Sequence, residues 1–368
     1  MKAWVLHAPG DIRFEDVPVP EPAEEEVLVK VKACGICGSD VPRVYQTGAH
    51  RMPLIPGHEF SGVVEACGKG ADPGWKGKRV GIYPLIPCRE CAPCRQGLYE
   101  ICRNYDYTGS RRDGAFAEYV TVPAQNLIEL PDEVSYEEAA MLEPMAVAVH
   151  AMRRGTGTLR NDLKQYNGNG EGALCKDAPV AVCGLGTIGL LIVSFLQDAG
   201  YRNLYLIGNK EFQKTAALRM GIIEEHFCDS RTEDAAAWLQ RTCGGAALFF
   251  ECVGRNDSIC YAIDGTAPAG RVVTVGNPAG DMAFSRDTYW KILRNQLVVF
   301  GTWNSSFFAG DKSMQPDDWH YVLDRMEHGD IKPASLITHR LPIDQLEQGL
   351  LIMKEKKEDH CKVMTIME

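Results

Sequence analysis

Residues 178–200, APVAVCGLGTIGLLIVSFLQDAG, constrain the fold of this chain more than any other stretch. A short apolar run leads into Gly184, Gly186 and Gly189, and an apolar helical pattern follows. In the dinucleotide fingerprint the first glycine permits a tight turn, the second admits a pyrophosphate to the helix N-terminus, and the third lets helix and strand approach closely. We therefore interpret this stretch as a dinucleotide site in a doubly wound parallel sheet, and not as a purely structural turn.

The following strand bears on which dinucleotide is bound. An acidic residue about 20 positions after the glycines normally binds the ribose 2′-hydroxyl of NAD, but NLYLIGNKEFQK has Gly208 at that position. Without that carboxylate, Asn209 and Lys210 can contact a 2′-phosphate, which favours NADP. The alternative, in which Glu211 replaces the missing acid and NAD binds, stays open. The predicted cofactor-binding residues are Gly184, Gly186, Thr187, Ile188, Gly189, Gly208, Asn209 and Lys210.

A second constraint is CRECAPCRQGLYEIC, residues 88–102, which contains Cys88, Cys91, Cys94 and Cys102. The two-residue gaps between the first three cysteines let thiolates converge on one ion. Zinc suits this spacing better than an iron–sulfur cluster, whose bacterial spacing ends with a three-residue gap and a Cys-Pro pair. Four unligated cysteines are the remaining alternative. A closed four-thiolate site has no open position for a substrate, so we predict a structural zinc lobe.

Charge and hydropathy narrow the possible partners and location. A formal net charge of -10 over 368 residues repels phosphate backbones and anionic lipids, so neither nucleic acid nor a membrane is an expected partner. No apolar run approaches the ~18 residues of a transmembrane helix, and Asp11 and Glu15 interrupt the N-terminal apolar stretch, unlike a signal peptide. We expect a cytoplasmic protein of two domains, in which clustered thiols stay reduced.

Three further stretches carry groups that can hold a catalytic metal. The alternating run VLVKVKA predicts a half-buried strand that leads to CGICGSD and Cys37. PGHEFSG supplies His58 and Glu59, and MLEPMAVAVH supplies Glu143. Each residue alone is unremarkable, because single cysteines and helix-end carboxylates are common structural residues. Together they offer a thiolate, an imidazole and carboxylates, which is the ligand set of an open zinc site.

These motifs occur in the order found in zinc-dependent medium-chain dehydrogenases, which the chain resembles over essentially its whole length. The resemblance implies an α/β protein with a GroES-like β-barrel catalytic domain, formed by residues 1–150 and 303–368 and including the zinc lobe. Residues 151–302 would form a Rossmann domain with a doubly wound parallel sheet. The resemblance also implies an active site in the interdomain cleft, two zinc ions per chain, NAD(P), and a homodimer or homotetramer.

The resemblance assigns roles to residues around the catalytic zinc. It makes Cys37, His58 and Glu143 the zinc ligands, and Glu59 a carboxylate that binds or exchanges at the metal. It makes Asp40 the group that orients the ligand histidine, which would set the tautomer and basicity of that ring. It makes Ser39 the hydroxyl that passes the substrate proton toward solvent.

A departure from the family pattern concerns the later part of this proton path. The histidine that continues the relay in the alcohol-specific branch is replaced here by Pro42. Residues 155–177 form a second unusual stretch, because they are polar, glycine-rich and aperiodic and so predict a long loop. Residues 297–306 begin as an apolar strand, and by resemblance the edge of this strand pairs across a dimer, with Trp303 and Asn304 near the substrate.

Within the family, GSDVPRVYQTGAH, GHEFSGVV and YTGSRRDGAFAEYV are most similar to the branch that acts on galactitol 1-phosphate. The expected activity is reversible hydride transfer between a secondary alcohol of this or a similar sugar-alcohol phosphate and NAD(P), giving the ketose phosphate. Arg43, Arg111, Arg112 and Lys291 are the candidate phosphate-binding cations. The alternatives are a dehydrogenase of free polyols such as sorbitol, xylitol or butanediol, and a zinc-bound redox sensor or binding protein without turnover.

Overall fold

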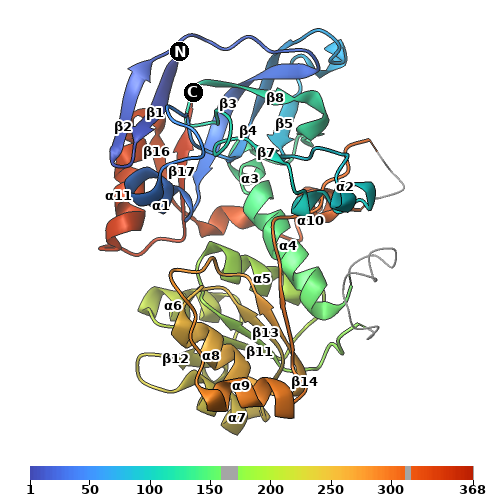
Figure 1. The fold of residues 1–368 in the computed structure, drawn as a ribbon, viewed down its shortest axis with the longest axis vertical. Coiled ribbons are helices and arrows are strands. Elements are labelled where there is room, and N and C mark those ends of the chain that lie inside the picture. Colours follow the sequence, from blue (N-terminus) through green and yellow to red (C-terminus); the bar gives the residue numbers. More distant parts are fainter. Residues whose placement is uncertain (159–172, 311–315, 368) are drawn as a thin grey trace. The chain divides into compact units, whose positions relative to one another are not determined.

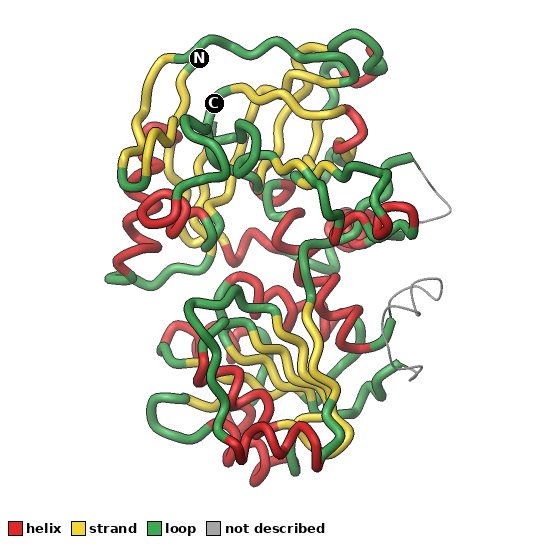
Figure 2. Tube along the Cα trace, viewed as in Figure 1, coloured by secondary structure: helices red, strands yellow, loops and turns green. Residues whose placement is uncertain are grey.

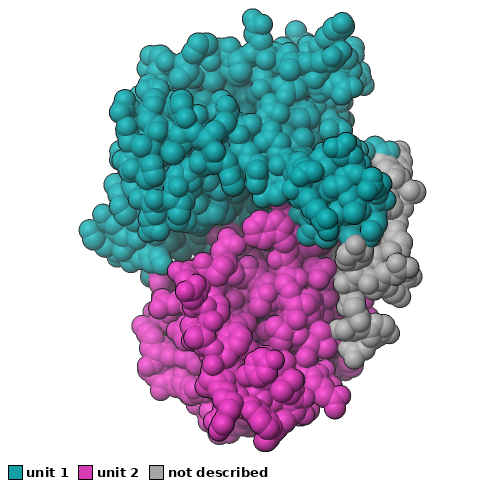
Figure 3. Space-filling model, in the orientation of Figure 1, with its two compact units in different colours: residues 1–146, 305–368 teal, residues 147–304 magenta. Residues whose placement is uncertain are grey.

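The computed structural model describes residues 1–158, 173–310 and 316–367. The chain forms two compact units, which are coloured separately in Figure 3. Unit 1 contains Met1–Ala146 and Ser305–Glu368, and unit 2 contains Val147–Asn304. The expected boundaries at 150 and 303 differ from these by a few residues, because helix α4 (Leu142–Thr156) continues from one unit into the other.

Unit 1 is built on a seven-stranded sheet with the strand order β16-β17-β3-β4-β5-β9, and β8 also pairs with β3 (Figure 1). Two short two-stranded sheets, β1-β2 and β6-β7, complete it. The strands are β1 Lys2–Ala8, β2 Asp11–Asp16, β3 Glu26–Ile36, β4 Glu59–Cys67, β5 Arg79–Ile82, β6 Leu85–Ile86, β7 Asp106–Tyr107, β8 Tyr119–Pro123, β9 Leu127–Glu129, β16 Ile337–Pro342 and β17 Lys362–Ile366. The helices are α1 Asp40–Pro42, α2 Ala92–Arg95, α3 Tyr136–Ala139, α10 Asp318–Glu327 and α11 Leu346–Glu355.

Strand β3 organises the core of unit 1 and confirms the predicted alternation. Val27, Val29, Val31 and Ala33 are fully buried, whereas the lysines between them remain partly exposed. Side chains on a strand alternate between its two faces, so one face of β3 enters the core. β3 pairs with β4, β8 and β17, which come from distant parts of the sequence. The turn after β3 is therefore held beside the ends of strands that are remote in sequence.

Unit 2 contains a six-stranded, fully parallel sheet with the order β12-β11-β10-β13-β14-β15. Figure 2 shows these strands side by side with helices packed around them. The strands are β10 Val180–Cys183, β11 Leu204–Gly208, β12 Phe227–Asp229, β13 Ala246–Glu251, β14 Thr266–Thr274 and β15 Val298–Gly301. The helices are α5 Thr187–Asp198, α6 Glu211–Arg219, α7 Ala235–Cys243, α8 Asn256–Gly265 and α9 Arg286–Arg294. The strand order reverses at β10, which is where this kind of sheet binds dinucleotides.

The predicted fold class, a GroES-like barrel with a Rossmann sheet, is therefore confirmed. The loop predicted over 155–177 begins later than expected, since α4 continues to Thr156. Most of that stretch, residues 159–172, lies outside the described residues. Among the residues that the structure describes, no helix combines the length and the apolar character needed to cross a membrane.

Candidate active site

The glycine-rich turn of unit 2 fits a bound dinucleotide. Gly184 follows β10 with a φ of 93°, in the left-handed region that favours glycine. A Cβ on Gly189 would overlap the carbonyl oxygen of Gly184, so the third glycine allows α5 to approach the strand closely. Gly186 is the N-cap of α5, and the space beside its Cα is open. Thr187 and Ile188 begin the helix, so their backbone amides lie where a pyrophosphate binds in this motif.

The end of β11 carries no acidic side chain. The strand ends at Gly208, and the amide of Asn209 donates to the side-chain oxygen of Gln213 at 2.9 Å. Lys210 is the N-cap residue of α6, and its Nζ lies 5.7 Å from the centre of the Phe212 ring. The three residues predicted to contact the cofactor ribose therefore follow one another at the edge of the parallel sheet where the other cofactor-binding residues lie.

Arg231 is a cation near this strand end that sequence reasoning missed. Asp229, the last residue of β12, lies opposite Gly208 in the sheet. Its carboxylate accepts from Arg231 at 2.5 Å, and this hydrogen bond lowers the pKa of Asp229 to about 2. The end of β12 thus places the Arg231 guanidinium and its paired carboxylate beside Gly208. The local sequence contains no motif that predicts this placement.

The four cysteines of the 88–102 lobe face one another. Their sulfur atoms are separated by 4.0 Å for Cys88 and Cys94, 3.8 Å for Cys91 and Cys102, and 3.4 Å for Cys88 and Cys102. A tetrahedral zinc with Zn–S bonds of about 2.3 Å places its sulfurs about 3.8 Å apart, so the lobe fits this metal. Hydrogen bonds from the backbone of Arg103 and Cys94 lower the pKa of Cys91 to about 6, which favours the thiolate that zinc requires.

A second cluster of metal-binding groups lies in unit 1. Cys37, His58 and Glu59 each offer one ligand atom, and these three atoms lie within 4.8 Å of one another. Cys37 follows β3, while His58 and Glu59 stand at the start of β4, and the antiparallel pairing of these strands brings them together. Burial raises the pKa of Cys37 to about 12, so the thiolate needs a cation for its stability. This donor set fits a catalytic zinc.

Glu59 is bonded to a lysine that sequence reasoning missed. Lys362, the first residue of β17, donates to Glu59 Oε2 at 2.5 Å and to the carbonyl oxygen of Ile36 at 3.3 Å. Both charged side chains are almost completely buried. Burial by itself would lower the pKa of Lys362, but the charges of Glu59 and Cys37 outweigh it and raise that pKa. A Cβ on Gly35 would overlap the Glu59 carboxylate, so this glycine makes room for the ion pair.

A weak signal for this lysine exists in the sequence. Lys362 opens the apolar strand KVMTI, and a charged residue at such a position requires a partner when the strand is central. The identity of the partner cannot be read from the strand itself.

Glu143 is the remaining predicted ligand, and it lies beside this cluster. Its carboxylate is not among the ligand atoms that lie within 4.8 Å of one another. It is the second residue of α4 and is buried, and Tyr107 donates a hydrogen bond to its Oε1 at 3.2 Å. The Tyr107 ring in turn meets the edge of the His58 ring, with 5.7 Å between their centres. Burial raises the pKa of Glu143 to about 7, against the lowering effect of His58. Glu59 thus belongs to the cluster, Tyr107 holds Glu143 next to it, and the roles of both carboxylates at the metal stay predictions.

Asp40 orders the turn that presents Cys37. Its Oδ2 accepts from the amide of Cys37 at 2.9 Å, and its other oxygen is bound by Arg43. Nδ1 of His58 is buried without a hydrogen-bond partner among the described residues and lies 3.7 Å from Asp40, too far for a hydrogen bond. Asp40 therefore lies beside the predicted ligand histidine at ion-pair distance but without a hydrogen bond, and its orienting role stays a prediction. Ser39 is the N-cap of α1, and its side chain makes no capping bond.

The TGSRRDG loop, residues 108–114, packs directly against the turn that presents His58. A Cβ on either Gly109 or Gly114 would overlap the carbonyl oxygen of Gly57, so two glycines of the loop permit the close approach. The amide of the residue after the loop donates to the same Gly57 oxygen at 2.9 Å. The loop is therefore fixed to the backbone next to a predicted metal ligand.

The two adjacent arginines of this loop have different environments. Arg112 pairs with Glu26 at 2.5 Å at the first residue of β3, whereas Cys37 follows the other end of that strand. The Arg111 guanidinium lies 4.5 Å from the centre of the Tyr105 ring. That both arginines face the substrate stays a prediction, although the structure gives Arg112 a carboxylate partner and stacks Arg111 on a ring.

The other predicted substrate residues belong to unit 2. Lys291 of α9 pairs with Asp264 at 3.0 Å, which argues against a free phosphate-binding role. Trp303, just after β15, is 52% exposed, and Asn304 has a φ of 55°. Arg43 is the exception, because it belongs to unit 1. It forms an ion pair with Asp40.

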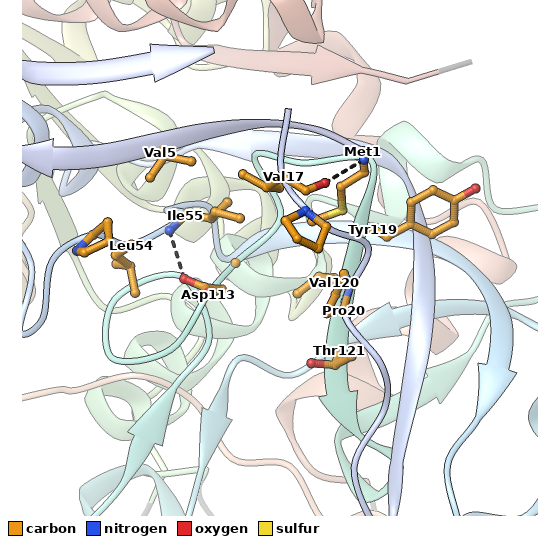
Figure 4. A pocket seen from close by; sticks show the side chains of 13 residues that line it. Met1, Val5, Val17, Pro20, Leu54, Ile55, Asp113, Tyr119, Val120 and Thr121 are labelled. Carbon is orange, nitrogen blue, oxygen red and sulfur yellow. Dashed lines mark hydrogen bonds between the residues drawn. The ribbon is translucent and has the colours of Figure 1, made fainter. Parts of the chain in front are cut away.

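A separate cavity of about 270 Å³ in unit 1 contains none of the predicted metal ligands among its lining residues. Figure 4 shows apolar side chains such as Val5, Leu54 and Val120 around it. Its polar edge is Asp113, which accepts a hydrogen bond from the amide of Ile55 at 3.0 Å. The cavity is therefore separate from the predicted metal cluster.

Comparison with known proteins agrees with the two sites. Residues 23–132 match the alcohol dehydrogenase GroES-like domain, and residues 187–328 match the zinc-binding dehydrogenase domain. Galactitol 1-phosphate 5-dehydrogenase of Escherichia coli K12 is 30% identical over 353 residues, which cover 95% of each chain. Sorbitol dehydrogenase of Bacillus subtilis is 26% identical over 372 residues, covering 99% of this chain and 96% of the relative.

Solved structures show the same similarity. Galactitol-1-phosphate dehydrogenase from Escherichia coli matches with a TM-score of 0.86 at 30% identity over the full length of both chains. A zinc-binding dehydrogenase from Sinorhizobium meliloti bound to NADP and an Escherichia coli CFT073 alcohol dehydrogenase complexed with NADH each match with a TM-score of 0.84 at 26% identity, covering 100% of this chain and 99% of theirs. The chain therefore belongs to the zinc-dependent medium-chain alcohol and polyol dehydrogenases.

Proposed function

We propose that this enzyme transfers hydride reversibly between a secondary alcohol of galactitol 1-phosphate, or of a similar sugar-alcohol phosphate, and NAD(P), giving the ketose phosphate. The observation that carries the proposal is the buried group Cys37, His58 and Glu59, onto which the TGSRRDG loop is packed. The metal-type cluster supports alcohol oxidation, and the cationic loop beside it supports an anionic substrate. The similarity to galactitol 1-phosphate 5-dehydrogenase supports the same substrate class.

In the proposal, two zinc ions are held by this chain, one by the four-cysteine lobe and one by Cys37, His58 and the carboxylates of Glu59 and Glu143. When bound, the catalytic zinc supplies a Lewis acid that makes the alcohol acidic, and the nicotinamide accepts the hydride. Lys362 holds the Glu59 carboxylate in place, and Tyr107 holds that of Glu143.

Ser39 is proposed to take the alcohol proton toward solvent. It stands two residues after Cys37, at the start of α1, and its side chain is not used to cap that helix. A hydroxyl can both accept and donate a proton, which a relay at this position needs. Trp303 and Asn304 remain proposed substrate neighbours from the family resemblance, and a cytoplasmic location remains a prediction from the lack of a signal-peptide or membrane-span pattern.

Initial rates test the proposed function. Oxidation of galactitol 1-phosphate, galactitol and sorbitol is measured at equal concentrations, each with NAD and with NADP, on protein that retains its zinc. A strong preference for the phosphorylated substrate supports the proposal. Comparable or faster rates with free polyols overturn it in favour of the free-polyol alternative, which the similarity to sorbitol dehydrogenase supports.

We expect NADPH to bind at least about ten-fold more tightly than NADH, because Gly208 leaves the strand end without a carboxylate and Lys210 can form a charge-assisted hydrogen bond with the 2′-phosphate. Fluorescence titration of the two reduced cofactors measures the ratio. Lys210→Met should remove most of the preference, whereas Lys214→Met on the same helix should keep it, since Lys214 is paired with Glu224 at 2.5 Å. Equal or reversed affinities in the unmodified enzyme contradict the prediction.

We also propose that the enzyme is a homodimer or a larger homo-oligomer. Among the described strands, β15 has a neighbour only on its β14 side, and Val299 on it is exposed. Such an open edge beside exposed Leu293 and Trp303 is suited to pairing with a second copy. Val299→Lys should convert the oligomer to monomers in light scattering, while Val19→Lys on unit 1 should not. A monomeric unmodified protein would refute this proposal.

A further inference from the structure

Arg111 differs from the neighbouring arginines in its hydrogen bonding. Its Nε is buried and has no hydrogen-bond partner among the described residues, although its guanidinium lies over the Tyr105 ring. Arg43 and Arg112 are instead paired with carboxylates. A buried guanidinium N–H without an acceptor is unfavourable, so this arrangement indicates an acceptor that the protein itself does not supply.

The position of Arg111 relates it to the reacting group. The TGSRRDG loop that carries it is packed on the Gly57 carbonyl, next to His58. Ring contacts also connect Arg111 to that ligand: Tyr105 lies 6.2 Å from Tyr107, and the Tyr107 ring lies 5.7 Å from that of His58. The free guanidinium is therefore on the side of the molecule where the alcohol would react.

We propose that Arg111 binds the phosphate of the substrate, and that Arg43 and Arg112 do not. The proposal rests on the proposed function, a phosphorylated polyol. Arg111 contributes charge-assisted hydrogen bonds from its guanidinium N–H groups, and its plane is held by Tyr105. The partnered arginines have structural roles: Arg43 fixes Asp40, and Arg112 fixes the start of β3.

The test compares the ratio of kcat/KM for galactitol 1-phosphate to that for galactitol in the unmodified enzyme and in variants. Arg111→Met should lower this ratio by about 10- to 100-fold, the effect of losing a hydrogen bond to a charged group. The matched controls Arg112→Met and Arg51→Met should change it less than about two-fold, because their charges are already paired with Glu26 and Asp113.

A second measurement uses inorganic phosphate as a competitor of galactitol oxidation. The inhibition constant of phosphate should rise about 10-fold or more in Arg111→Met. It should rise less in Arg111→Lys, which keeps the positive charge. An enzyme without preference for the phosphorylated polyol contradicts the proposed function itself. An enzyme with that preference, in which Arg111→Met keeps the ratio or Arg112→Met loses it equally, overturns the assignment of Arg111 and leaves the proposed function intact.

Discussion

Replacing His58 by asparagine is expected to lower kcat by at least about 1,000-fold and to reduce the zinc content from two ions per chain to one. The imidazole belongs to the buried group in which three ligand atoms lie within 4.8 Å. A Lewis acid at an alcohol oxygen is worth several kcal/mol of barrier, which corresponds to a loss of this size. Steady-state kinetics gives kcat, and elemental analysis of dialysed protein gives the zinc content.

The remaining zinc ion should stay in the four-cysteine lobe, because those sulfurs are independent of His58. His328→Asn is the matched control, since this histidine is exposed at the end of α10 and should leave both kcat and zinc unchanged. A His58→Asn protein that retains two zinc ions and normal turnover would show that the cluster does not hold the catalytic metal.

Replacing Lys362 by methionine is expected to lower the free energy of unfolding by about 3–5 kcal/mol, which is the typical cost of breaking one partner of a buried ion pair. Lys362 and Glu59 are both almost fully buried, so the substitution leaves the Glu59 carboxylate without its cation in the core. Urea unfolding of zinc-loaded protein, followed by circular dichroism, measures the change. The variant should also lose activity, because Glu59 is no longer held beside Cys37.

Two further variants separate this effect from a simple loss of charge. Lys78→Met breaks the exposed pair of Lys78 with Glu129, which should cost less than about 1 kcal/mol. The double variant Lys362→Met with Glu59→Gln should recover part of the lost stability, because no unpaired charge then remains buried. If Lys362→Met and Lys78→Met cost the same, the buried pair has no special role in holding the site.

Several elements of the site could be predicted because their geometry is local. Gly184 and Gly189 act within one strand, turn and helix, and the backbone path of that unit alone explains why each must be glycine. The four cysteines lie within fifteen residues, so a short loop suffices to bring their sulfurs together. The alternating burial of β3 follows likewise from the two-residue period of a strand.

Other elements could not be predicted because they depend on how distant strands align. Lys362 and Glu59 are 303 positions apart, and they meet only because β17 and β4 both pair with β3 in a particular register. Arg111 and Arg112 are neighbours in sequence and looked equivalent. The fold gives one of them a carboxylate at the start of β3 and leaves the other over an aromatic ring.

By itself, the sequence determined the fold class, the family, the zinc lobe and the glycine-rich turn, since each depends on residue types at short, fixed spacings. Only the tertiary structure decided which cations are paired, that Tyr107 holds Glu143, and that Lys362 supports Glu59. The physical reason is that a charge inside a protein takes its partner from whatever the sheet register places within about 3 Å, and that distance is set by long-range packing.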